Sequence, residues 1–101
     1  MIAASVETRR GALEERVPRL ILRAPPDTRV WAFRAAVSRI RASIEDASDA
    51  IATDAPWDVV ERPLWSRGHG VSVALELRTH DGRDSQADLG VEVLRAVAAT
   101  I

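Results

Sequence analysis

The fold is decided by a stretch in the first half of the chain, residues 29–54, RVWAFRAAVSRIRASIEDASDAIATD. Its apolar side chains recur at alternating steps of three and four residues, which is the spacing of one face of an α-helix. They are Val30, Phe33, Val37, Ile40, Ile44, Ala47 and Ile51. Asp27 or Thr28 can cap the start of the helix, and Pro56 marks its end. This stretch therefore predicts one long helix with a narrow apolar stripe.

Two arrangements can bury this stripe, a sheet of the same chain or a helix of a second copy. The charges favour an antiparallel pair, because arginines lie near the start of the helix and acidic residues near its end, both opposed to the helix dipole. Packing of the acidic half against the basic segment 9–23 is the intramolecular rival. We expect a homodimer through this helix, with the helix lying on its own sheet left open. The interaction residues would be Trp31, Arg34, Val37, Ile40, Arg41 and Ile44.

The chain before this helix divides into two parts. Residues 1–16 hold few sizeable apolar side chains, so we expect a flexible or weakly ordered segment and a domain that spans 17–101. Residues 17–24 alternate apolar and polar side chains, as a strand does, and Pro18 confines that strand to an edge or a strand beginning. A helix through Leu13 and the following residues also fits the spacing and stays open.

After the long helix, residues 57–65 and 71–79 read as two strands of a hairpin. Pro63 favours an edge position for the first strand. In the second strand the valines and leucines alternate with polar residues, so we expect one buried face and one wet face. A last helix follows over residues 87–101, and Leu75 with Leu94 should be central to the core. The sequence predicts a small single α+β domain, with a β-hairpin or three-stranded antiparallel sheet and helices on one face.

Composition excludes several classes of protein. The chain has 101 residues with 47% hydrophobic side chains, enough for one core, and its 14 basic and 15 acidic residues nearly balance. It lacks cysteine, a long apolar run and a secretory signal, so we expect a soluble cytoplasmic protein without membrane contact. Lysine, asparagine and tyrosine are absent while arginine and alanine are common, which fits a G+C-rich bacterial gene.

No pattern of catalytic residues stands out, so we expect no enzyme, no cofactor and no metal site. The two histidines, His69 and His80, lack metal-ligand spacing. The segment 66–70, SRGHG, could offer backbone amides to an anion, although a hairpin loop explains it as well. A ligand site built from Arg67, His69, His80 and Asp81 is the rival to a protein without a site of its own.

The charges are unevenly distributed along the chain. Residues 1–41 hold nine arginines and four acids, and residues 42–101 hold five arginines and eleven acids. The basic half lacks the aromatic and glycine pattern of RNA-binding sheets, so nucleic acid is not the expected partner. We expect a non-catalytic protein-interaction domain, an adaptor, regulator or antitoxin-like component of a bacterial assembly. The alternative is a small ligand- or nucleic-acid-binding module that uses the basic half or the 66–70 loop.

Overall fold

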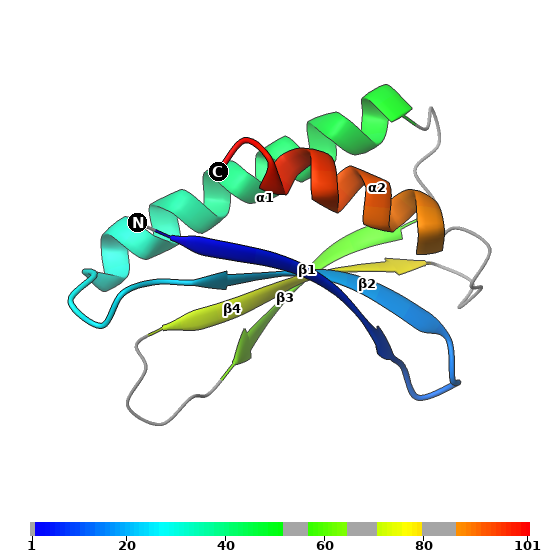
Figure 1. The fold of residues 1–101 in the computed structure, drawn as a ribbon, viewed down its shortest axis with the longest axis horizontal. Helices are drawn as coiled ribbons and strands as arrows, with labels where there is room; N and C mark the ends of the chain where they lie inside the picture. Colours follow the sequence, from blue (N-terminus) through cyan, green and yellow to red (C-terminus); the bar gives the residue numbers. More distant parts are fainter. Residues whose placement is uncertain (1, 52–56, 65–70, 80–86) are drawn as a thin grey trace.

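The described residues form two layers, an antiparallel sheet with both helices on one of its faces (Figure 1). The computed structural model describes residues 2–51, 57–64, 71–79 and 87–101. The strands lie side by side in the order β1-β2-β4-β3, and every neighbouring pair is antiparallel. This arrangement confirms the predicted α+β class. The elements are β1 Ala3–Arg10, β2 Arg16–Arg23, α1 Val30–Ile51, β3 Trp57–Leu64, β4 Ser72–Thr79 and α2 Ala87–Ala98.

Helix α1 lies on the sheet of its own chain. Phe33, Val37 and Ile44 of the predicted stripe are buried in the core. Packing on the sheet of the same chain, which the sequence left open as the alternative to a dimer, therefore buries the apolar stripe. The end of the helix is fastened to β3, because the indole N–H of Trp57 donates to Ser48 Oγ at 3.1 Å and the Ser48 hydroxyl donates to the Ile44 carbonyl at 2.8 Å.

The core lies between the central strands and the two helices. Leu75 of β4 and Leu94 of α2 are fully buried there, as the sequence predicted. Helix α2 approaches β2 closely at Gly90, where an added Cβ would stand 2.9 Å from Cγ of Pro18. The helix can pack this closely on β2 because position 90 has no side chain.

The N-terminal segment differs from the expectation of weak order, because Ala3–Arg10 forms the edge strand β1 and pairs with β2 along its length. Its small apolar residues Ala4 and Val6 are partly buried against the core, where α2 also contacts the strand. Burial under a helix distant in sequence makes these short side chains sufficient, and composition alone does not reveal that cover.

Both proline positions agree with the strand rules. The strand β2 begins at Arg16 and pairs with β4 only from Arg19 onward, so Pro18 lies at the strand beginning. The strand β3, which contains Pro63, is the other edge of the sheet. The helical alternative for the segment around residues 17–24 is excluded, because this segment is a strand at the centre of the sheet.

Candidate functional site

The face of the sheet turned away from α1 and α2 is the candidate site, and we call it the outer face (Figure 1). Leu20, Leu22 and Leu75 point to the helices, so the residues that alternate with them point the other way. The register then aligns Glu7, Arg19, Glu76 and Val60 in one row across all four strands. The charged residues of the outer face are Glu7, Arg9, Arg19, Arg23, Asp58, Arg62, Glu76 and Arg78.

Glu76 occupies the centre of the outer face and has no exposed surface. Arg9 donates two hydrogen bonds to its carboxylate, from Nε to Oε2 at 2.6 Å and from Nη2 to Oε1 at 3.2 Å. Three further guanidinium groups surround it: the Nε of Arg62 is 3.5 Å from Oε1, Nη1 of Arg19 is 3.8 Å from Oε2, and Nε of Arg78 is 3.9 Å from Oε1. We call these four arginines the arginine cluster.

The arginine cluster decides the ionisation of Glu76. Burial is the largest single influence and raises the pKa of this carboxyl. The hydrogen bond from Arg9 and the charges of Arg9, Arg62 and Arg78 together outweigh it, so the pKa of Glu76 lies below its ordinary value. The same hydrogen bond raises the pKa of Arg9, against the opposing effect of burial. Glu76 is thus held as a carboxylate at neutral pH and is not poised to exchange protons.

The positive charge of the cluster exceeds the negative charge that it neutralises. Arg19 also forms an ion pair with Glu7, its direct neighbour across the strands. Five arginines therefore share the described part of the outer face with three carboxylates, those of Glu7, Asp58 and Glu76, and this excess of positive charge favours binding of a further carboxylate. Arg62 and Arg78 keep 47% and 34% of their side-chain surface exposed, so both have donors that remain accessible to a partner.

The residues predicted from the helix stripe do not form one surface. Val37 and Ile44 lie in the core, and Ile40 is partly buried against it. Arg41 donates from Nη2 to the carbonyl of Val59 at 2.7 Å, which ties α1 to β3. A helix pair built on the stripe itself would have to separate α1 from its own sheet.

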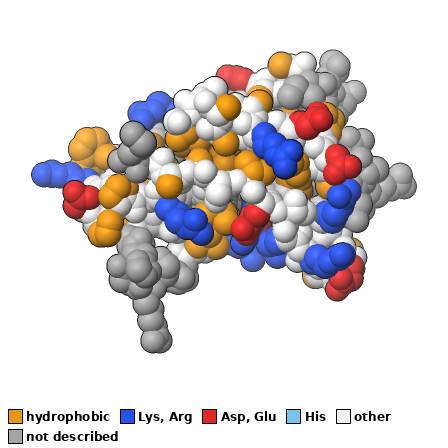
Figure 2. Space-filling model, viewed as in Figure 1, with side chains coloured by type: hydrophobic (Ala, Val, Ile, Leu, Met, Phe, Trp, Pro, Cys, Tyr) orange, Lys and Arg blue, Asp and Glu red, His pale blue; other side chains and the backbone are white. Residues whose placement is uncertain are grey.

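Two predicted residues remain exposed near the start of α1. Trp31 shows 70% of its surface and does not cover β2, and Arg34 is also exposed. Val30 beside them is 54% exposed, although it opens the heptad stripe. Hydrophobic side chains are visible at the end of the molecule where α1 begins (Figure 2). Self-association through this exposed end of the helix stays a prediction.

The rival ligand site falls outside the part of the chain that the structure describes. Arg67, His69, His80 and Asp81 belong to residues 65–70 and 80–86, as does the whole 66–70 loop. Within residues 2–51, 57–64, 71–79 and 87–101, no group of histidine, aspartate and glutamate side chains is arranged to hold a metal ion. Over the same residues, neither helix combines the length and the apolar character needed to cross a membrane.

Sequence reasoning missed Glu76 as the centre of a site, because the alternation in β4 predicted a wet face for it. Ser72, Ala74 and Glu76 on that face are in fact buried. The usable signal was the pattern of charges: Arg19, Glu76 and Arg78 all fall on the non-core side of their strands. The contribution of Arg9 had no such signal, since it depends on β1 and on the strand order.

Comparisons with protein-family models, with curated protein sequences and with solved structures found no match to this chain.

Proposed function

We propose that this chain is a non-catalytic protein-interaction domain that binds an acidic segment of a partner protein on the outer face. The observation that carries this function is the excess of guanidinium groups around the buried Glu76. Arginine suits such a role because its planar fork binds carboxylates with two hydrogen bonds and is weakly hydrated.

Binding is favoured over catalysis by the state of Glu76. A carboxylate that is fully engaged by arginines has no free lone pair directed at a substrate, and its lowered pKa keeps it from acting as a general acid near neutral pH. We propose the setting that the composition favours, the cytoplasm of a bacterium, and a role as adaptor, regulator or antitoxin-like component of an assembly.

An acidic protein segment is favoured over nucleic acid by the neighbours of the cluster. The described residues of the outer face include no aromatic ring on which a base could stack, and of their apolar side chains Ile21 and Ala74 are buried while Val60 is partly exposed. Arginines beside a partly exposed apolar side chain are typical of protein interfaces. An extended segment with alternating acidic and apolar residues would match both features.

The test compares two probes on the full chain. A fluorescein-labelled peptide of alternating glutamate and valine should bind with an affinity that falls as salt rises, and the same peptide with glutamine should not bind. Arg23→Gln with Arg62→Gln changes two exposed arginines of the outer face, of which Arg62 belongs to the arginine cluster, and should weaken binding of the acidic peptide at least tenfold. The control is Arg39→Gln with Arg95→Gln, which removes the same charge from exposed positions on the helices.

Two outcomes would contradict this function. Equal loss in both double variants would mean that only net charge matters. Tighter binding of a labelled single-stranded RNA than of the peptide, again dependent on Arg23 and Arg62, would make the outer face a nucleic-acid interface.

A further inference from the structure

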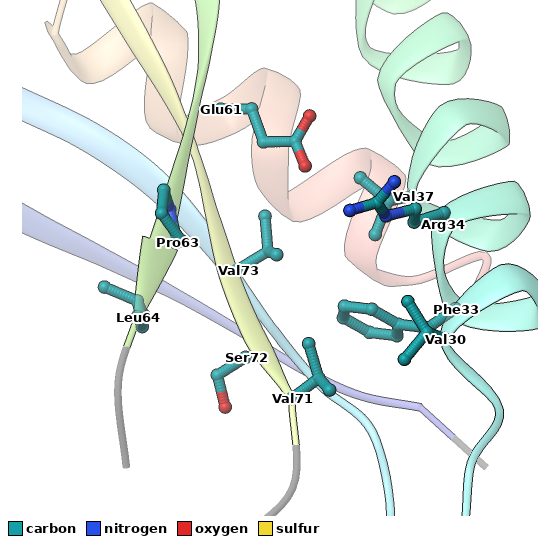
Figure 3. Close-up of a pocket in the computed structure, with 10 residues that line it drawn as sticks. All are labelled: Val30, Phe33, Arg34, Val37, Glu61, Pro63, Leu64, Val71, Ser72 and Val73. Atoms are coloured by element: carbon teal, nitrogen blue, oxygen red, sulfur yellow. The ribbon is translucent and has the colours of Figure 1, made fainter.

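Two adjoining cavities lie between the first half of α1 and the edge of the sheet formed by β3 and β4, and we call them together the groove (Figure 3). One, of about 410 Å³, is mainly apolar, with Phe33, Val37 and Val73 among the residues that line it. The other, of about 360 Å³, is lined by Arg34, Val37, Ser38 and Glu61. Three of these residues, Arg34, Val37 and Glu61, line both cavities, so a polar compartment opens directly into an apolar one.

The groove exists because α1 is fastened to β3 at one end only. The contacts of Ser48 with Trp57 and of Arg41 with Val59 hold the second half of the helix against the start of the strand. Helix α2 lies on the same face and contacts β1 and β2, in the half of the sheet away from β3. No described helix therefore covers the second half of β3, and Glu61 and Pro63 are exposed although their partners in the register are the core residues Leu75 and Val73.

Two opposite charges face the groove from its two walls. Figure 3 shows the guanidinium of Arg34 directed from α1 toward β3, and the carboxylate of Glu61 directed from β3 toward α1. Among the described residues, neither the Arg34 nor the Glu61 side chain has an ion pair or a hydrogen bond with another side chain. Both charges are therefore free to bind a ligand that carries a carboxylate and a cation.

Both charged residues line one cavity. Arg34 and Glu61 line the same polar compartment, so one ligand that carries a carboxylate and a cation can contact both side chains there. An α-amino acid carries both groups on one carbon. The adjoining compartment would then receive the side chain, and its lining by phenylalanine and valine favours an apolar one.

We propose that the groove binds an apolar α-amino acid, with its carboxylate on Arg34, its ammonium group on Glu61 and its side chain against Phe33, Val37 and Val73. A volume of about 410 Å³ is within the range of pockets that hold small molecules, and the combination of an apolar lining with a few convergent polar groups is typical of them. This site is separate from the outer face, because Glu61 and Arg62 point to opposite sides of β3.

The experiment is a titration of the ¹⁵N-labelled full chain, followed by amide shifts in NMR spectra, with L-phenylalanine as the probe. Two analogues remove one charge each: 3-phenylpropionate lacks the ammonium group, and 2-phenylethylamine lacks the carboxylate. L-phenylalanine should bind at least tenfold more tightly than either analogue, and the amides of Phe33 and Val73 should be among those that shift.

Variants then pair each ligand charge with its residue. Arg34→Gln should weaken binding of L-phenylalanine at least tenfold and leave binding of 2-phenylethylamine unchanged, because that analogue has no carboxylate for Arg34 to bind. Glu61→Gln should likewise weaken binding of L-phenylalanine and leave binding of 3-phenylpropionate unchanged, because that analogue has no ammonium group. Arg39→Gln on α1 and Glu92→Gln on α2 are the matched controls, since both positions are exposed and outside the groove.

Several results would overturn this site. Equal binding of the three probes would show apolar contact without recognition of the charges, and shifts confined to other residues would place the ligand elsewhere. If Arg34→Gln or Glu61→Gln changed the oligomeric state in solution relative to the wild type, a second copy of the chain would be the occupant of the groove. Arg23→Gln with Arg62→Gln should leave amino-acid binding intact, which separates this site from the function of the outer face.

Discussion

Arg9 of β1 reaches over β2 to hold both carboxylate oxygens of Glu76 on β4, a residue 67 positions later in the chain. The pair joins two strands that are not neighbours in the sheet. An edge strand with only small apolar side chains therefore gains a side-chain anchor in addition to its backbone pairing with β2. The ionic contact at the centre of the outer face is also a contact that orders the N-terminal segment.

Glu76→Gln should destabilise the protein by about 2 kcal/mol, because the variant loses two charge-assisted hydrogen bonds and removes the carboxylate at the centre of the arginine cluster. Urea denaturation at neutral pH measures the change. Arg10→Gln is the control, since Arg10 lies on the same strand with 70% of its side chain exposed, and its effect should stay within about 0.5 kcal/mol. Equal effects of the two variants would contradict the role assigned to Glu76.

The same carboxylate should make stability depend on acid pH. The pKa of Glu76 is lower in the folded chain than its ordinary value of 4.5, so its contribution is complete above 4.5 and is lost as the pH falls through the folded pKa. Denaturation midpoints of the wild type and of Glu76→Gln, measured from neutral pH to about pH 3, should therefore converge on the acid side. A constant difference over this whole interval would be inconsistent with the lowered pKa.

Leu75→Ala and Leu94→Ala should each cost roughly 2 to 5 kcal/mol of stability, because both side chains are fully buried and each truncation leaves a cavity. Chemical denaturation is again the measurement. Leu13→Ala provides the contrast, since Leu13 is 81% exposed and its loss should be nearly neutral. Denaturation midpoints close to that of the wild type for both variants would contradict the placement of Leu75 and Leu94 in the core.

Gly90→Ala should destabilise the protein, against the usual preference of helices for alanine. Alanine normally gains about 1 kcal/mol over glycine inside a helix, but here its Cβ would stand 2.9 Å from the ring of Pro18 and push α2 off β2. The reverse exchange at exposed Ala96, Ala96→Gly, should cost about 1 kcal/mol by preference alone. A stabilising Gly90→Ala would show that the helix can move without loss.

Self-association, which the heptad spacing predicted, is tested by light scattering at micromolar concentration. Phe33, Val37 and Ile44 are buried against the sheet, so a dimer would have to use the exposed start of α1. Trp31→Ala should then dissociate it, because a tryptophan that is 70% exposed is the largest apolar group there. A mass near 11.0 kDa for the wild type would contradict the dimer.

The periodic elements were predictable from the sequence, and the relations between them were not. The stripe of α1 and the alternation around Leu20 and Leu75 are local patterns, so the long helix and the strands β2 and β4 follow from them, and β3 follows as the partner of β4 in the predicted hairpin. The strand β1 lacks such a pattern, since its apolar residues are small and its cover by α2 is a long-range contact. Without β1 and the strand order, neither the meeting of Arg9 with Glu76 nor the facing of Arg34 and Glu61 could be anticipated.

The hydrogen bond from Arg41 to the carbonyl of Val59 also bears on how the sheet avoids aggregation. Pro63 cannot donate a hydrogen bond, so its nitrogen is tolerated on the open side of the edge strand β3. Val59 lies four residues earlier and has the same orientation, which puts its carbonyl on that open side too. One potential donor is thus missing and one acceptor already occupied, and the edge offers an approaching strand an interrupted ladder in place of a continuous template.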